Sequence, residues 1–227
     1  MDSPREQYLA ACTEIAESLS TLGFKFACSG PHAQRKNGDF TYRVSFQSSH
    51  KNVPGHSVAL WIHATVSSKR LGEWRASQPH ALGVGDGVAG GQIGNLVRPH
   101  GWRNWNLAGP TKAAVIADAT SAVHSIALPY FDRFLDIPDL CEQLQREELP
   151  AMDTARAIEF LLCFADRMTA DAALGAFFRA RPELRPDFHT HFQEFSKSGL
   201  PKVCRTGFAY ELAFVTVAYG LTPPNAT

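Results

Sequence analysis

The stretch FTYRVSFQ, residues 40–47, decides the fold class because its apolar and polar side chains alternate one by one. A period of two is typical of a strand with one buried and one exposed face. The side chains that we expect to be buried are Phe40, Tyr42, Val44 and Phe46. Residues 57–66, SVALWIHATV, repeat the pattern after a loop at residues 51–55. Two strands joined in this way are most simply antiparallel.

An amphipathic helix is expected before these strands. Ser3-Pro4-Arg5-Glu6 has the form of a capping box with proline at the first helical position. Apolar residues then recur every three or four positions as far as Gly23, which predicts a helix over residues 4–22. Asn37-Gly38 is expected to form a tight turn. Further short strands are expected at residues 24–28, 34–36, 92–97 and 102–107.

From residue 113 onward the apolar period is helical, with a break expected at Pro129 and a cap at Thr169. The expected helices cover residues 113–128, 130–144, 153–168, 170–179, 186–197 and 203–219. A charged run with Pro150, at residues 147–152, indicates a boundary. The sequence therefore predicts an α+β fold, with an antiparallel sheet and an N-terminal helix in residues 1–148. A helical C-terminal segment is expected in residues 149–227.

Residues 67–91 show no sustained period, so we expect a long loop, or flap, between the second long strand and the next one. Within it Gly85, Gly87 and Gly90 have the spacing G-x-G-x-x-G of dinucleotide-binding loops. That motif works only between a buried strand and the start of a helix, and proline and further glycines oppose both here. We therefore expect no cofactor, and a mobile connection instead.

The overall charge is balanced, since 22 Lys and Arg accompany 22 Asp and Glu and the pI is near 7.1. No bulk positive field attracts nucleic acid, so a nucleic-acid partner is not expected. The chain has neither a signal peptide nor a long apolar run, which predicts a cytoplasmic protein without membrane contact. Five cysteines lack C-x-x-C spacing, and His189 and His191 point apart on a helix, so no metal site is expected.

The two long strands place a mixed set of side chains on their second face. If the apolar residues pack on the core, Arg43 and Gln47 share the opposite face with Trp61 and His63. Tryptophan beside arginine is typical of a recognition surface, because both give large contact energies. The alternative is that Trp61 packs beneath the flap or the C-terminal helices and that the polar groups are satisfied locally.

A second aromatic cluster follows in the segment RPHGWRNW, residues 98–105. Positive charge with stacking surface favours single-stranded nucleic acid or a phosphorylated ligand, although the balanced overall charge argues against the first. More commonly such a cluster is an aromatic strand end packed under a loop. The predicted binding residues are Arg43, Gln47, Trp61, His63, Trp102 and Trp105.

Several short motifs occur in a fixed order: LGFK at residues 22–25, FQSS at 46–49, IGNL at 93–96, WRNWNL at 102–107 and ALPYFDRF at 127–134. In this order the chain resembles an uncharacterised bacterial family catalogued only as a domain of unknown function. The resemblance covers roughly residues 8–145, and the family has adjacent tryptophans where this chain separates Trp102 from Trp105. It implies an α+β fold and a bacterial origin, and it carries no established reaction or catalytic residues.

Two hypotheses about function remain open. No nucleophile elbow, phosphate loop or metalloprotease motif occurs, so the first is a non-enzymatic binding protein with a protein partner. An immunity-type protein that neutralises a bacterial toxin is one example. The second is a small-molecule or nucleotide-handling enzyme with its site beneath the 67–91 flap, using Gln47, and with His63 as its acid or base.

Overall fold

The computed structural model describes residues 2–83, 85–146 and 148–225. The chain forms two compact units, of which the first comprises residues 1–67 and 89–135 and the second residues 68–88 and 136–227. This division differs from the boundary expected at residues 147–152, where Glu147 lies outside the described residues. The reason is that the chain leaves the sheet between residues 68 and 87, and the segment 68–88 forms one unit with the C-terminal helices.

The first unit is built on an antiparallel sheet, as the alternating strands predict, and the α+β fold class is confirmed. The strands are β1 (Lys25–Ala27), β2 (His32–Asn37), β3 (Phe40–Gln47), β4 (Ala59–Ser68), β5 (Gly87–Gln92) and β6 (Trp105–Asn106). Their order is β1-β2-β3-β4-β5, and β6 pairs with the start of β4. The β2–β3 hairpin pairs Asn37 with Phe40, so its turn is Gly38-Asp39, one residue later than expected.

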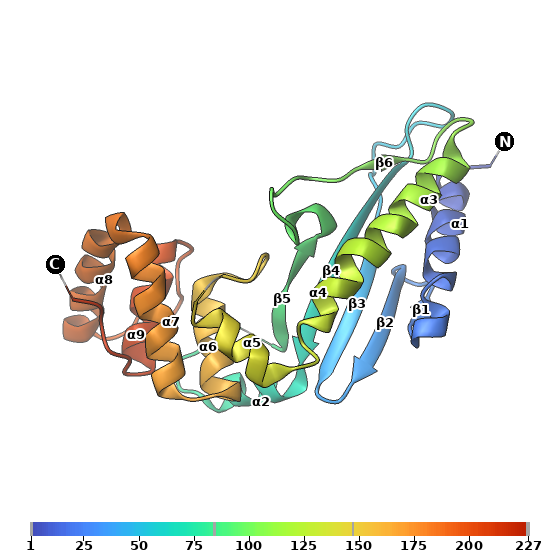
Figure 1. The fold of residues 1–227 in the computed structure, drawn as a ribbon. Helices are drawn as coiled ribbons and strands as arrows, with labels where there is room; N and C mark the ends of the chain where they lie inside the picture. Colours follow the sequence, from blue (N-terminus) through green and yellow to red (C-terminus); the bar gives the residue numbers. More distant parts are fainter. Residues whose placement is uncertain (1, 84, 147, 226–227) are drawn as a thin grey trace. The chain divides into compact units, whose positions relative to one another are not determined.

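One face of the sheet is buried beneath helices (Figure 1). These are α1 (Pro4–Glu17) and a long helix made of α3 (Lys112–Ala122), a π-helical turn (Val123–Ala127) and α4 (Leu128–Asp132). The expected alternation is present, since the apolar residues of β3 and Leu60, Ile62, Ala64 and Val66 of β4 are buried. Tyr42 packs its ring 5.2 Å from that of Phe131 and donates a hydrogen bond to the Phe134 carbonyl.

The N-terminal helix begins as its capping box predicts. Ser3 accepts a hydrogen bond from the Glu6 amide, and the Glu6 carboxylate accepts one from the Ser3 amide. These two bonds satisfy backbone donors that a helix start otherwise leaves free. The helix ends earlier than expected, at Glu17, and a 3-10 turn (Ser20–Leu22) follows it.

Pro129 does not break the helix, contrary to the expectation from sequence. It lies near the start of α4, directly after the π-helical turn. Because that turn already departs from the usual i to i−4 bonding pattern, the missing proline N–H is tolerated there. The break comes at residues 133–136 instead, where Asp136 caps α5 (Ile137–Leu144).

The second unit is mainly helical. Besides α5 it contains α2 (Lys69–Ser77), α6 (Thr154–Phe164), α7 (Arg167–Ala180), a 3-10 turn (Pro182–Leu184), α8 (Arg185–Ser198) and α9 (Phe208–Ala218). Helix α6 packs against α2, α7 and α9, and α8 packs against α9. Asp166, rather than Thr169, caps α7, because its carboxylate accepts from the amide and the hydroxyl of Thr169. Within the described residues, no helix is both long and apolar enough to cross a membrane.

The segment expected to be a flap contains regular structure. Residues 69–77 form α2, capped by the Ser68 hydroxyl, and residues 87–92, in the glycine-rich stretch that follows, form β5. A Cβ atom on Gly90 would lie 2.3 Å from the Ala64 carbonyl oxygen, so β5 approaches β4 as only a glycine strand allows. The strand expected at 92–97 is therefore displaced toward the N-terminus, and Ile93–Asn95 is a 3-10 turn.

Candidate functional site

Three of the predicted binding residues lie together on the face of the sheet opposite the helices. Trp61 and His63 project from β4, and the ring centroid of Trp102 lies 6.1 Å from each of theirs. Both contacts are edge to face. Trp61 and His63 are half-buried, whereas Trp102 is 60% exposed. This aromatic cluster, Trp61, His63 and Trp102, presents one large apolar side chain to solvent.

The loop that carries Trp102 is fastened by the side chain of Gln92, which is only 2% exposed. The amide group of Gln92 donates to the Arg103 carbonyl over 2.6 Å. Its oxygen accepts from the Gly94 amide at 2.8 Å and from the Arg103 amide at 3.3 Å. The buried side chain of Gln92 therefore bonds both the backbone N–H and the carbonyl of Arg103, the residue that follows Trp102.

A direct backbone contact closes the same loop. The Gly101 amide donates to the Gly94 carbonyl over 3.1 Å. A Cβ atom on Gly94 would lie 1.7 Å from the Gly101 oxygen, so only glycine fits at this position. Trp102 is thus exposed but held by fixed neighbours, and this lowers the entropy that its side chain and loop would lose on binding.

His63 carries a buried ring nitrogen, Nε2, that has no hydrogen-bond partner among the described residues. Burial lowers the pKa of His63 below its ordinary value, because the charged form is poorly solvated there. An imidazole that acts as a general base is usually oriented by a carboxylate or another acceptor. His63 contacts the indole ring of Trp102 edge to face, which is typical of a packing residue.

Arg43 and Gln47 are exposed on β3, as the alternation predicts. Arg43 donates to the side-chain oxygen of Gln34 over 3.1 Å, and the register of β1, β2 and β3 aligns Lys25, Gln34 and Arg43 in one row. These residues belong to the same outward face as Trp61 and His63, because they occupy the strand positions between the buried ones.

Trp105 does not belong to this face. It pairs with Leu60, whose side chain is buried, and is itself buried. Its indole N–H donates to the Asp118 carboxylate over 2.7 Å, which ties β6 to α3. For Trp105 the structure therefore corresponds to the packed strand end that is the more common arrangement of such a residue.

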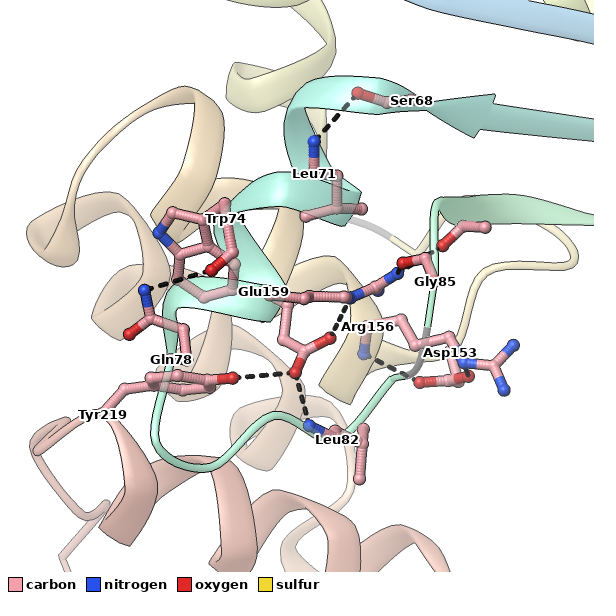
Figure 2. Close-up of polar contacts among 12 residues, drawn as sticks. Ser68, Leu71, Trp74, Gln78, Leu82, Gly85, Asp153, Arg156, Glu159 and Tyr219 are labelled. Atoms are coloured by element: carbon pink, nitrogen blue, oxygen red, sulfur yellow. Dashed lines mark hydrogen bonds and ion pairs between the residues drawn. The ribbon is translucent and has the colours of Figure 1, made fainter.

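The second unit contains a buried polar cluster that the sequence did not indicate (Figure 2). Arg75 Nε donates to Glu159 over 2.8 Å, and the two side chains are 3% and 0% exposed. The other oxygen of Glu159 accepts from the Leu82 amide at 2.6 Å and from the Tyr219 hydroxyl at 2.8 Å. Figure 2 shows these two donors converging on Glu159. Burial, and then the charge of Glu159, raise the pKa of Tyr219.

The glycine-rich stretch is part of this cluster. Arg75 Nη1 donates to the carbonyl of Gly87 over 2.6 Å and to that of Gly85 over 3.3 Å. A Cβ atom on Gly83 would lie 2.8 Å from the central carbon of the guanidinium group. The backbone of this stretch thus surrounds a side chain of its own unit and supplies two carbonyl acceptors to its Nη1, whereas the buried Nη2 has no partner among the described residues. Sequence reading missed this role because the only signal, a buried arginine, is not visible in the pattern.

A groove of about 1050 Å³ lies in the second unit between α8 and the start of α9. It is lined by acidic and basic side chains, including Glu194, Lys202 and Arg205, and by the ring of Tyr210. His191 packs against Tyr210, and its buried Nδ1 atom lies 3.7 Å from the Glu194 carboxylate, with no hydrogen-bond partner in the part of the chain that the structure describes. Among the described residues, no group of three or more His, Cys, Asp or Glu is arranged to hold a metal ion.

Comparisons with protein-family models, with curated proteins and with solved structures gave no significant match. The resemblance to a bacterial family of unknown function therefore stays a prediction. What can be argued about function comes from the two units themselves.

Proposed function

We propose that this chain is a non-enzymatic binding protein that recognises a protein partner through the aromatic cluster of Trp61, His63 and Trp102. The observation that carries the proposal is the position of Trp102, exposed at its ring and fastened at its backbone. Exposed tryptophans on rigid supports are the side chains that most often dominate protein interfaces. The half-buried side chains of Trp61 and His63 support the Trp102 ring through edge-to-face contacts.

The enzyme hypothesis lacks the features on which it rested. It required a flap over residues 67–91, but residues 69–77 are helical and 87–92 are a strand. A carboxylate within hydrogen-bond distance of His63 would favour it, but the buried Nε2 of His63 has no partner in the described part of the chain. A binding role needs neither feature.

Immunity-type neutralisation of a bacterial toxin is the narrower proposal within this class. It requires that the partner be a toxin and that binding be tight and stoichiometric. Neighbouring genes bear directly on it, because a toxin gene beside this one would name the partner. Co-expression of that toxin with the wild-type chain would then restore growth, and co-expression with Trp102→Ala would not.

The broader proposal is tested by affinity capture with the full chain and two matched variants. Trp102→Ala is expected to reduce retention of a stoichiometric partner at least about tenfold, as truncation of a central interface tryptophan does. Leu135→Ala removes another large apolar side chain of the same unit, 53% exposed, and is expected to retain the partner like the wild type. Equal retention by wild type and Trp102→Ala would remove the basis of the proposal.

A further inference from the structure

The balanced charge of the whole chain conceals an uneven distribution within the first unit. Residues 18–67 and 89–111, which hold its strands and their loops, contain seven Lys or Arg and a single carboxylate, Asp39. No Asp or Glu occurs within any of the six described strands, nor in residues 40–72 and 87–117 as a whole. The other carboxylates of this unit are Asp2, Glu6, Glu14, Glu17, Asp118 and Asp132, in or beside α1, α3 and α4.

This distribution separates the two faces of the sheet electrostatically. The helices that carry these carboxylates cover one face (Figure 1), and the strand positions of the opposite face include Lys and Arg but no Asp or Glu. Lys25 and Arg43 are exposed in the row across β1, β2 and β3. Arg98 and Arg103 are exposed on the loop that presents Trp102.

Not every basic residue of the strands contributes to the open face. Arg35 lies on the helical side, where its guanidinium group packs over the rings of Phe24 and Tyr42 and donates to the Leu22 carbonyl. The cations available to a partner are therefore those beside the aromatic cluster and the exposed cations of the outward face, Lys25, Lys36 and Arg43. A cationic surface around an exposed tryptophan is complementary to an apolar or aromatic residue flanked by carboxylates.

Single-stranded nucleic acid is the other polyanion to which such a surface could be complementary. Binding of that kind uses several aromatic faces, on which successive bases stack. Here one ring, that of Trp102, is largely exposed, and its neighbours Trp61 and His63 are half-buried and meet it edge to face. The arrangement offers one anchor point rather than a row of stacking platforms, so it favours a protein segment.

We infer that the partner surface is acidic: the aromatic cluster takes an apolar or aromatic residue, and Lys25, Arg43 and the arginines beside Trp102 pair with Asp or Glu on either side. This inference rests on the proposed function and adds the chemistry of the partner to it. It concerns exposed charges, so their contribution is expected to appear as specificity and salt dependence more than as raw affinity.

The test is selection of peptides from a random phage-displayed 16-residue library on the immobilised full chain. The selected peptides are expected to be enriched in Asp and Glu around an aromatic residue or leucine. For a synthetic copy of the best peptide, Lys25→Gln/Arg43→Gln is expected to raise the Kd about tenfold, because two exposed charge pairs are lost. Added NaCl is expected to weaken binding by the wild type more than by this variant.

Matched variants distinguish an acidic partner from a binding face without that preference. Arg5→Gln removes an exposed cation of α1, on the helical face, and is expected to leave the Kd of the peptide unchanged. If Trp102→Ala abolishes binding but the peptides lack acidic residues, or Lys25→Gln/Arg43→Gln binds like the wild type, the acidic partner is refuted and the binding face stands. If no peptide is selected, or Trp102→Ala binds like the wild type, the proposed function itself fails. Tighter, Trp102-dependent binding of fluorescein-labelled dT20 would overturn the inference in favour of nucleic acid.

Discussion

Arg75 and Glu159 are 84 residues apart in the sequence and form an ion pair that solvent scarcely reaches, with 2.8 Å between Nε and Oε2. Two charges in such a place are stable only because each has further partners. Glu159 has the Leu82 amide and the Tyr219 hydroxyl, and Arg75 has the carbonyls of Gly85 and Gly87. This pair joins the segment 68–88 to the helices of its own unit.

Removal of one member of this pair is expected to be costly. Glu159→Gln leaves the Arg75 charge buried without a counter-ion, which typically lowers the free energy of unfolding by about 3–5 kcal/mol. Urea denaturation of both proteins measures the change. Arg146→Ala, which breaks an exposed pair with Glu142, is the matched control and is expected to cost no more than about 1 kcal/mol. Similar losses in the two variants would contradict the buried role of Glu159.

Gly83 is expected to be intolerant of a side chain. Gly83→Ala places a methyl group 2.8 Å from Arg75 Cζ, so the guanidinium group must shift away from its partners. Such overpacking costs about 1–3 kcal/mol of unfolding free energy. Gly87→Ala serves as the control, because its Cβ would meet nothing within 4 Å, and thermal unfolding compares the two. A Tm for Gly83→Ala equal to that of Gly87→Ala would show that Arg75 is not confined there.

The loop of Trp102 depends on the contact between two glycines. Gly94→Ala would set a methyl group 1.7 Å from the Gly101 oxygen, so the loop must open and Trp102 must leave Trp61 and His63. Acrylamide quenching of tryptophan fluorescence is expected to increase, because Trp61 loses its cover. In the control Gly101→Ala the added Cβ would meet nothing within 4 Å, so its fluorescence is expected to be quenched as in the wild type. Unchanged quenching in Gly94→Ala would mean that the loop does not position Trp102.

His63 is expected to make stability depend on pH. Burial lowers its pKa below the ordinary value of 6.5, so in the range below that value the unfolded chain binds more protons than the folded one. The contribution is therefore present above about pH 6.5 and is lost as the pH falls toward the folded-state pKa. Between pH 8 and pH 5, the free energy of unfolding is expected to decrease more for the wild type than for His63→Gln. His100→Gln, at an exposed position on the Trp102 loop, is expected to follow the wild type, and parallel profiles for all three would refute the assignment.

Local patterns were sufficient for much of the first unit. The alternation in residues 40–47 and 57–66 reports burial directly, so it predicted the sheet and the outward direction of Trp61 and His63. The start of α1 was equally readable, because both capping partners lie within four residues. The sequence did not show toward which face of the sheet Trp102 and Trp105 point, because the loop before them is irregular. Only the pairing of Trp105 with β4 places the two residues on different faces.

Features that depend on distant residues were not readable. Helix α2 has few apolar residues, and one of its inward positions is Arg75, whose partner comes 84 residues later. Half of the residues of strand β5 are glycine, so it has no period of hydrophobicity to detect. In the sequence Gln92 looks like any polar loop residue, because its partner, the backbone of Arg103, lies eleven positions later.

The chain passes from the first unit to the second and back before it enters the second again at residue 136. No single cut therefore separates the units, and a fragment of residues 136–227 would contain Glu159 without Arg75. The same order holds during synthesis, when α2 emerges long before the helices against which it packs. Until Glu159 has left the ribosome, Arg75 lacks its buried counter-ion. Residues 68–88 therefore reach their folded arrangement only after the second half of the protein has been synthesised.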